Sequence, residues 1–180
     1  GVSKDVSLAF EWYKKSAEGG DSLADSIVGE CYFLGKGTEM NEEEAIKWFQ
    51  LSADKGNEQG LLKMGLFYHY GVIVEKDRNK SIQLLEKAAA LPGSSEAKYY
   101  LGLHYLQDER DSSNQTKGFQ LLNEIKDPNE QAKVALGLCH EFGLGVEKNE
   151  KKAFENYKKD RNYSPLAMYN VGRCYEEGIG

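Results

Sequence analysis

The stretch Val28-Gly29-Glu30-Cys31-Tyr32-Phe33-Leu34-Gly35-Lys36-Gly37 contains the pattern that decides the fold. An apolar residue precedes a glycine, an aromatic residue follows that glycine by three positions, and a Gly-x-Gly turn begins six positions after it. The first part returns as Met64-Gly65-x-x-Tyr68, Leu101-Gly102-x-x-Tyr105, Leu136-Gly137-x-x-His140 and Val171-Gly172-x-x-Tyr175. Successive key glycines, as we call the glycine of this motif, are 36, 37, 35 and 35 residues apart. A near-constant step of this length indicates a repeat architecture.

Other positions keep the same register relative to the key glycine. The turn returns as Gly143/Gly145 and Gly178/Gly180, keeps only Gly71 in copy two, and is replaced by Asp108 and Arg110 in copy three. Asp or Asn follows the key glycine by twelve positions, as Asn41, Asp77, Asn114 and Asn149. A small residue follows it by sixteen positions, as Ala45, Ser81, Gly118 and Ala153. A bulky pair follows it by nineteen and twenty positions, as Trp48-Phe49, Leu84-Leu85 and Leu121-Leu122, with Asn156-Tyr157 in copy four. Each copy therefore has two halves, which a glycine turn joins in every copy but the third.

Each half is predicted to be a helix, since its apolar residues recur at helical spacing. The Gly-x-Gly turn ends the first helix, and the Asp/Asn series caps the start of the second. Gly20, Gly56 and Gly93 are expected to end second helices, while Asp127-Pro128 and Ser164-Pro165 are expected to start the helices that follow. The key glycine weakens its own helix, so a closely packed second helix is expected against it.

The combined pattern resembles the Sel1-like repeat family, a relative of the tetratricopeptide repeat proteins. The resemblance implies an all-α fold, a right-handed α-solenoid of antiparallel helix pairs that acts as a scaffold or adaptor. The predicted array covers residues 1–180, with half a repeat at 1–20, full repeats at 21–56, 57–93, 94–128 and 129–163, and half a repeat at 164–180. Because both ends fall in the same turn, the chain is expected to be a fragment of a longer protein.

Composition narrows the classes of function. The net charge of −6 disfavours nucleic acid, whose binding needs clustered Lys and Arg. No apolar run approaches the roughly 20 residues that span a bilayer, so no membrane insertion is predicted. The odd count of three cysteines favours a reducing, cytoplasmic setting. Two Asn-x-Ser/Thr sequons, at Asn114 and Asn162, keep the endoplasmic reticulum lumen open as the alternative.

Cys31, Cys139 and Cys174 share one register, two residues after the key glycine, where His104 stands in copy three. The alternatives for this register are a buried core position and a metal or redox column of His104, Cys139 and Cys174. Stacked helices lie about 10 Å apart, while bridged cysteine Cα atoms lie within about 7 Å. We therefore predict three free core thiols and no metal site. Because the sequence contains no phosphate-binding loop, nucleophile elbow or other catalytic constellation, we also predict no cofactor and no enzymatic activity. Some cysteine-rich relatives bind β-lactams, but this chain lacks their paired cysteines.

The first helices carry a second apolar face. Positions three before, one after and four after the key glycine lie opposite the helix-pairing residues. The predicted partner-binding strip consists of Leu62, Leu66, Tyr99, Leu103, Leu106, Val134 and Leu138. In tetratricopeptide-like folds this register lines the concave groove, but the same residues could be core between repeats, and both interpretations stay open. Glu30, Glu141 and Glu176 are expected at the margins of the strip, which would favour a basic partner.

The predicted function is a protein–protein interaction scaffold that grips a peptide or helix of an unidentified partner on its concave surface. The alternative is a structural spacer or oligomerisation arm of a larger, catalytic protein. Neither terminal helix looks capped, because Leu8, Trp12 and Met168 are available on them. End-to-end self-association or fraying of the ends is therefore expected.

Overall fold

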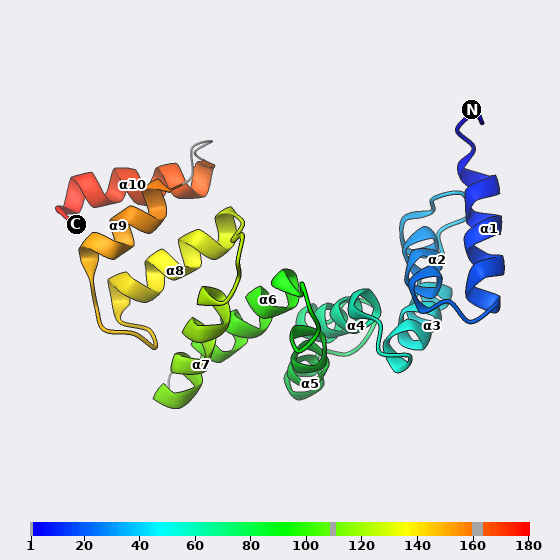
Figure 1. Ribbon diagram of the computed structural model, residues 1–180, viewed down its shortest axis with the longest axis horizontal. Helices are drawn as coiled ribbons and strands as arrows, with labels where there is room; N and C mark the ends of the chain where they lie inside the picture. The colour runs from blue at the N-terminus through cyan, green and yellow to red at the C-terminus, as the bar shows by residue number, and fades with distance from the viewer. Residues whose placement is uncertain (1, 109–110, 160–163) are drawn as a thin grey trace. The chain divides into compact units, whose positions relative to one another are not determined.

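The structure, a computed structural model, describes residues 2–108, 111–159 and 164–180. Arg110 of copy three and the predicted sequon at Asn162 lie outside these residues. The described residues form helices and connecting turns, without strands, as the repeat pattern predicts (Figure 1). The helices are α1 (Val6–Glu18), α2 (Ser22–Leu34), α3 (Glu42–Asp54), α4 (Glu58–Tyr70), α5 (Arg78–Ala89), α6 (Ser95–Leu106), α7 (Ser112–Asn123), α8 (Glu130–Phe142), α9 (Glu150–Lys158) and α10 (Pro165–Glu177).

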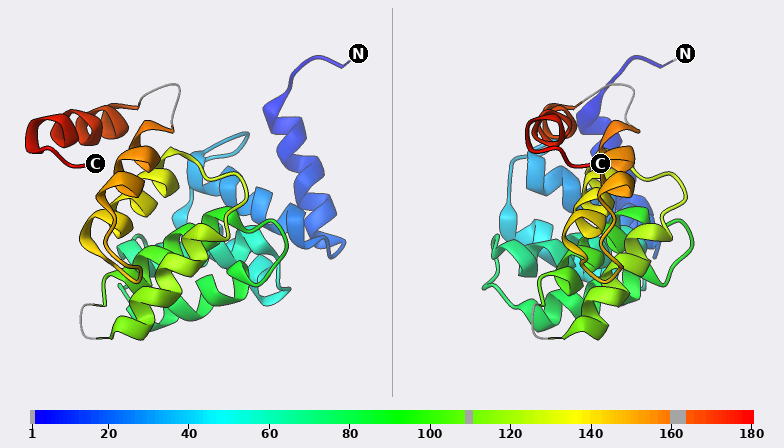
Figure 2. Two further views of the ribbon diagram at one scale, coloured as in Figure 1. Left: turned by 60° about the vertical axis from the view of Figure 1, so that its left-hand side comes forward. Right: turned by 90° about the vertical axis from the view of Figure 1, so that its left-hand side faces the viewer.

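The chain divides into two compact units, Gly1–Ser94 with α1 to α5 and Ser95–Gly180 with α6 to α10. In both units each first helix packs against the second helix of its own repeat, as α2 on α3 and α8 on α9. Figures 1 and 2 show α8 and α9 running in opposite directions along each other. Each predicted full repeat contains one such pair.

Short polar side chains start the helices. Asn41 caps α3 by accepting a hydrogen bond from the Glu44 N–H at 3.0 Å, and Ser164 caps α10, which has Pro165 in its first turn. Asp77 and Asn149 cap α5 and α9 as predicted. These side chains satisfy backbone donors that have no partner inside the helix.

Two predicted helix starts are wrong. In copy three, α7 begins at Ser112 with Asp111 as its cap, so Asn114 lies inside the helix and its side chain donates to Asp108 at 2.9 Å. Without the Gly-x-Gly turn, the connection is shorter and an earlier acid takes the capping role. The cap of α8 is Asn129 rather than Asp127, because the helix begins at Glu130, beyond Pro128.

The key glycines sit where the two helices of a repeat meet. A Cβ placed on Gly29 would lie 3.1 Å from the Phe49 ring, and one on Gly65 or Gly102 would lie 3.0 Å from Leu85 or Leu122. Gly137 is covered in the same way by the ring of Tyr157. The bulky residue twenty positions later therefore fills the space that the glycine leaves, and close helix packing compensates for its low helix propensity.

The second glycine of each turn makes a different contact. Gly37 lies directly against the Val6 carbonyl of α1, and Gly145 lies against the Gln115 carbonyl of α7. Each turn thus docks on the second helix of the preceding repeat, where a side chain would collide with the backbone. Copy two has Ile73 at this position, in the left-handed region with φ of 63°. A β-branched residue is strained in this backbone region.

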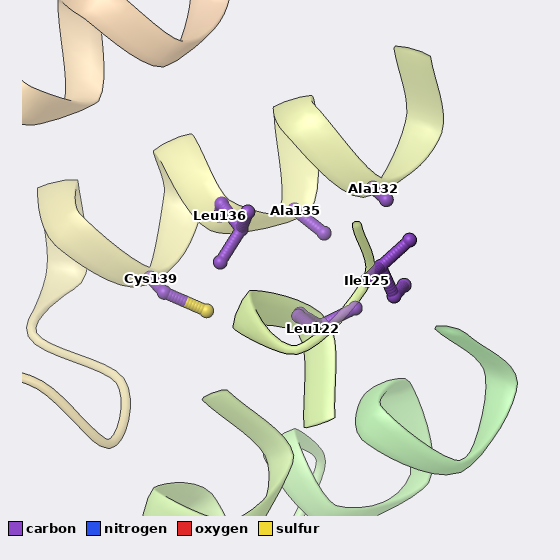
Figure 3. Close-up of a cluster of buried hydrophobic side chains, with 6 residues drawn as sticks. All are labelled: Leu122, Ile125, Ala132, Ala135, Leu136 and Cys139. Carbon is purple, nitrogen blue, oxygen red and sulfur yellow. The ribbon is translucent and has the colours of Figure 1, made fainter. Parts of the chain in front are cut away.

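The cysteine register lies in the core, as predicted. Cys31, Cys139 and Cys174 are buried and free, and His104 fills the same place at 3% exposure. Burial raises the pKa of the Cys139 thiol to about 12. Figure 3 shows Cys139 and three other side chains of α8 facing Leu122 and Ile125 of the preceding repeat. The cysteine register therefore contributes to the buried face between consecutive repeats.

Candidate functional site

Two positions of the first helices are exposed in every copy. They lie six before and five after the key glycine, eleven residues or about three helical turns apart, and so on one side of the helix. We call this side the open face. Its exposed large apolar side chains are Leu23, Leu34, Tyr70, Phe142 and Leu166. Exposure of Leu34, Tyr70 and Phe142 is 59%, 59% and 61%. Apolar side chains left in water at a repeated position are candidates for binding another protein.

Sequence reasoning did not select these residues, although a signal was present. Leu34, Tyr70 and Phe142 each stand immediately before the glycine that caps the first helix, Gly35, Gly71 or Gly143. A large apolar residue there covers no other repeat because the chain turns away directly after it. In copy three the equivalent position is Gln107, which is also exposed.

The predicted strip is more buried than expected. Leu62 and Val134 are 1% and 3% exposed, so the expectation of partial exposure is wrong for these two. The other five, Leu66, Tyr99, Leu103, Leu106 and Leu138, are half-buried. Leu62 and Leu66 belong to the first unit and the remaining five to the second.

In the second unit, packing between successive repeats causes this burial. Tyr99, Leu103 and Leu106 of α6 pack against the cluster that α8 forms with Leu122 and Ile125. On its other side, α8 places Val134 and Leu138 in the cluster that contains Tyr157 and Cys174. In the second unit, α8 therefore contacts a neighbour on both flanks, and only the edge of its part of the predicted strip reaches solvent.

A cavity of about 170 Å³ lies in the second unit, between the starts of α6 and α8. The residues that line the cavity include Glu96, Tyr99, Tyr100, Ile125, Asp127 and Ala132. The rings of Tyr99 and Tyr100 meet edge to face, with centroids 5.2 Å apart. Because Glu96 occupies the exposed position six before Gly102, the cavity lies beside the open face. Of the predicted strip, Tyr99 is the residue that reaches it.

The three predicted marginal acids have different environments. Glu30 and Glu176 are exposed, whereas Glu141 is 5% exposed and accepts hydrogen bonds from Arg173 at 2.6 and 2.7 Å and from the Tyr157 hydroxyl at 2.7 Å. The bond from Arg173 is the main cause that lowers the pKa of Glu141. Glu141 therefore links α8, α9 and α10 and is not available to a partner.

No group of His, Cys, Asp and Glu within the described residues could hold a metal ion. The buried carboxylate of Asp25 is paired within the fold, because it lies 2.6 Å from the Lys55 ammonium. His140, which replaces the aromatic residue of its copy, packs edge to face on Phe119 at 5.4 Å, as a packed aromatic substitute would. Among the helices that the structure describes, none has the length and apolar character needed to cross a membrane.

Comparison with known proteins agrees with the repeat register. The Sel1 repeat family matches residues 1–21, 131–159 and 165–180, and the plant tetratricopeptide repeat family matches residues 38–142. The crystal structure of a Sel1 repeat protein from Oxalobacter formigenes superposes with a TM-score of 0.84 at 31% identity, over 99% of this chain and 73% of that one. The chain belongs to the Sel1 repeat family. The predicted all-α solenoid repeat fold is thereby confirmed.

Two curated relatives of this Sel1 repeat chain have names that refer to other proteins. The DAP3-binding cell death enhancer 1 of Rattus norvegicus is 30% identical over 86% of this chain. The chitin synthase regulator SKT5 of Saccharomyces cerevisiae is 33% identical over 49% of the chain. The chain spans 30% of the length of the first relative and 13% of the second. Sel1 repeat proteins generally serve as interaction scaffolds.

Proposed function

We propose that this Sel1 repeat chain is an interaction scaffold that binds a peptide or helix of a partner protein on the open face of its first helices. The observation that carries the proposal is the exposure of Leu34, Tyr70 and Phe142 at one register position. The two units each contribute such a side chain, so each can bind on its own. On α4, half-buried Leu66 lies one turn before Tyr70, and on α8, half-buried Leu138 lies one turn before Phe142, so each would border the open face of its own unit.

The chemistry of the open face suits an amphipathic segment. Large aliphatic and aromatic side chains provide the apolar contacts that anchor a helix in a groove. Hot spots of protein interfaces are enriched in aromatic residues such as Tyr, and truncating one costs about 2 kcal/mol or more of binding free energy. The names of DAP3-binding cell death enhancer 1 and of the chitin synthase regulator support a role in partner binding. The proposal assigns no catalytic residue.

A peptide-display selection against the 180-residue chain tests this function. Peptides that bind should carry an apolar stripe at helical spacing, and their binding should fall when Leu34, Tyr70 and Phe142 are all replaced by Ser. The matched control replaces Met40 and Leu51, which are 68% and 40% exposed but lie off the first helices.

Failure to select any peptide above background would count against the scaffold. So would selected peptides whose binding survives the triple replacement but is lost in the control variant. In that case the partner surface would lie on the second helices.

A further inference from the structure

The cavity between α6 and α8 carries an inference about which side chain a partner presents. We propose that it receives a cationic side chain, of Arg or Lys, from the bound partner segment. The inference rests on the proposed function, because the cavity lies beside the open face. It concerns the second unit alone.

The size of the cavity favours a single side chain. Pockets that bind drug-sized molecules and cofactors occupy about 300–1,000 Å³. The volume of about 170 Å³ is well below that range. One long side chain that enters from a peptide on the open face would fill it.

The charge of the lining selects a cation. Glu96 and Asp127 both line the cavity, and none of the described residues that line it carries a positive charge. Lys98, two residues after Glu96, is paired with Glu124 at 2.8 Å rather than with either of these two acids. Complementary charge at the edge of an interface selects partners more than it adds affinity.

Apolar and aromatic surface completes the fit. The rings of Tyr99 and Tyr100 stand edge to face in the lining, and an aromatic ring attracts a cation at a centroid distance of up to about 6 Å. Ile125 and Ala132 provide apolar surface for the methylene stem, while the charged end reaches the acids.

An opposing effect comes from the helix starts. The beginnings of α6 and α8 carry partial positive charge, which favours an anion. Asn129 accepts a hydrogen bond from the Ala132 N–H at 2.9 Å, which removes one of the free donors of α8. Two full negative charges in the lining outweigh the remaining partial charge, so the cavity selects a cation.

Nuclear magnetic resonance titration of the 180-residue chain with capped single amino acids tests this. N-acetyl-arginine methylamide and the lysine equivalent should shift the amide signals of Glu96, Tyr100 and Gln131, while the norleucine and glutamate equivalents should not. The double variant Glu96→Gln, Asp127→Asn should weaken this binding about tenfold, whereas the matched Glu42→Gln, Glu155→Gln variant should not change it.

Three outcomes would overturn the inference: no shifts at the cavity with the arginine probe, equal shifts with norleucine, or binding of inorganic phosphate there instead. Tighter binding of spermidine than of the arginine probe would show a small-molecule site instead of a docking site. These results are separate from the test of the scaffold. Selected peptides that need Leu34, Tyr70 and Phe142 but no basic residue would leave the scaffold standing while this inference fails.

Discussion

At the scale of single residues, the key glycines make the clearest prediction. Gly137 lies under the Tyr157 ring, whereas a Cβ placed on Gly172 would meet no atom within 4 Å. Gly137→Ala should therefore destabilise the second unit by about 1–3 kcal/mol through overpacking. Gly172→Ala should stabilise α10 by up to about 1 kcal/mol, because Ala is the better helix former. Chemical denaturation of both variants checks the contrast, and equal effects of the two changes would contradict the packing role.

The thiols give a second prediction at this scale. Cys31, Cys139 and Cys174 are buried, and burial raises the pKa of each. At pH 8 the folded protein should react slowly with a thiol reagent, and Cys139 should react most slowly. Unfolding without a reductant should release three thiols per chain. Fewer than three in unoxidised protein, or fast reaction of Cys139 in the folded state, would disprove core placement.

Residue-level reasoning from the sequence was accurate where the repeat register applied. The register correctly predicted the buried position of the cysteines and the close approach at the key glycines of the four full repeats, since both follow from contacts that recur there. Ile73 shows its limit. The sequence shows that a glycine is missing from the turn of copy two, but not that isoleucine would adopt the same left-handed backbone.

At the scale of helices, the ion pair of Glu141 and Arg173 joins α8 to α10. Their side chains are 6% and 18% exposed, and removing one partner of a buried pair costs about 3–5 kcal/mol. Arg173→Met should therefore destabilise the second unit by about that amount. Glu177→Gln is the control, because Glu177 is 52% exposed at 3.2 Å from Arg173 and such surface pairs contribute about 1 kcal/mol or less.

The variant Arg173→Met should also reverse the pH dependence of stability that Glu141 causes. Arg173 lowers the pKa of Glu141 in the folded state, so the stability from this pair is present above the unfolded pKa of about 4.3 and is lost as the pH falls below it. Without Arg173, burial should raise the pKa of Glu141, and stability should then decline as the pH rises from about 4 to 7. Unfolding midpoints at several pH values measure this, and a flat profile for the variant would refute it.

Helix type and pairing could be predicted from the sequence, but the second face of the first helices could not. Periodicity indicates that Val134 lies opposite the pairing face, yet α8 is flanked by two repeats and buries residues on both sides. The first residue of α7 could not be predicted either, because copy three lacks the Gly-x-Gly turn that sets the position of the capping residue. The open face was not predicted from the sequence, because Leu34, Tyr70 and Phe142 look like ordinary residues of the last turn of a helix.

At the scale of the whole molecule, the outer faces of the terminal helices are uncovered. Leu8, Trp12 and Met168 are 55%, 63% and 50% exposed, as expected from the sequence. In sedimentation velocity, the 180-residue chain should associate as its concentration rises, since each repeat buries its faces against a neighbour. Trp12→Glu with Met168→Glu should abolish this, whereas Met40→Glu should not. A strictly monomeric wild-type sample would contradict the prediction.

The most direct test of the scaffold compares partner affinity and unfolding midpoint on the same single variants, with one selected peptide as the ligand. Tyr70→Ala changes the first unit and Phe142→Ala the second. At least one of these two variants should bind the peptide more weakly by about 1 kcal/mol or more, and neither should change the unfolding midpoint. Replacing Leu62 or Val134 by Ala should instead lower stability by about 1–5 kcal/mol, because both are core residues. Unchanged affinity in both surface variants, with binding lost only as the fold is lost, would contradict a binding site on the open face.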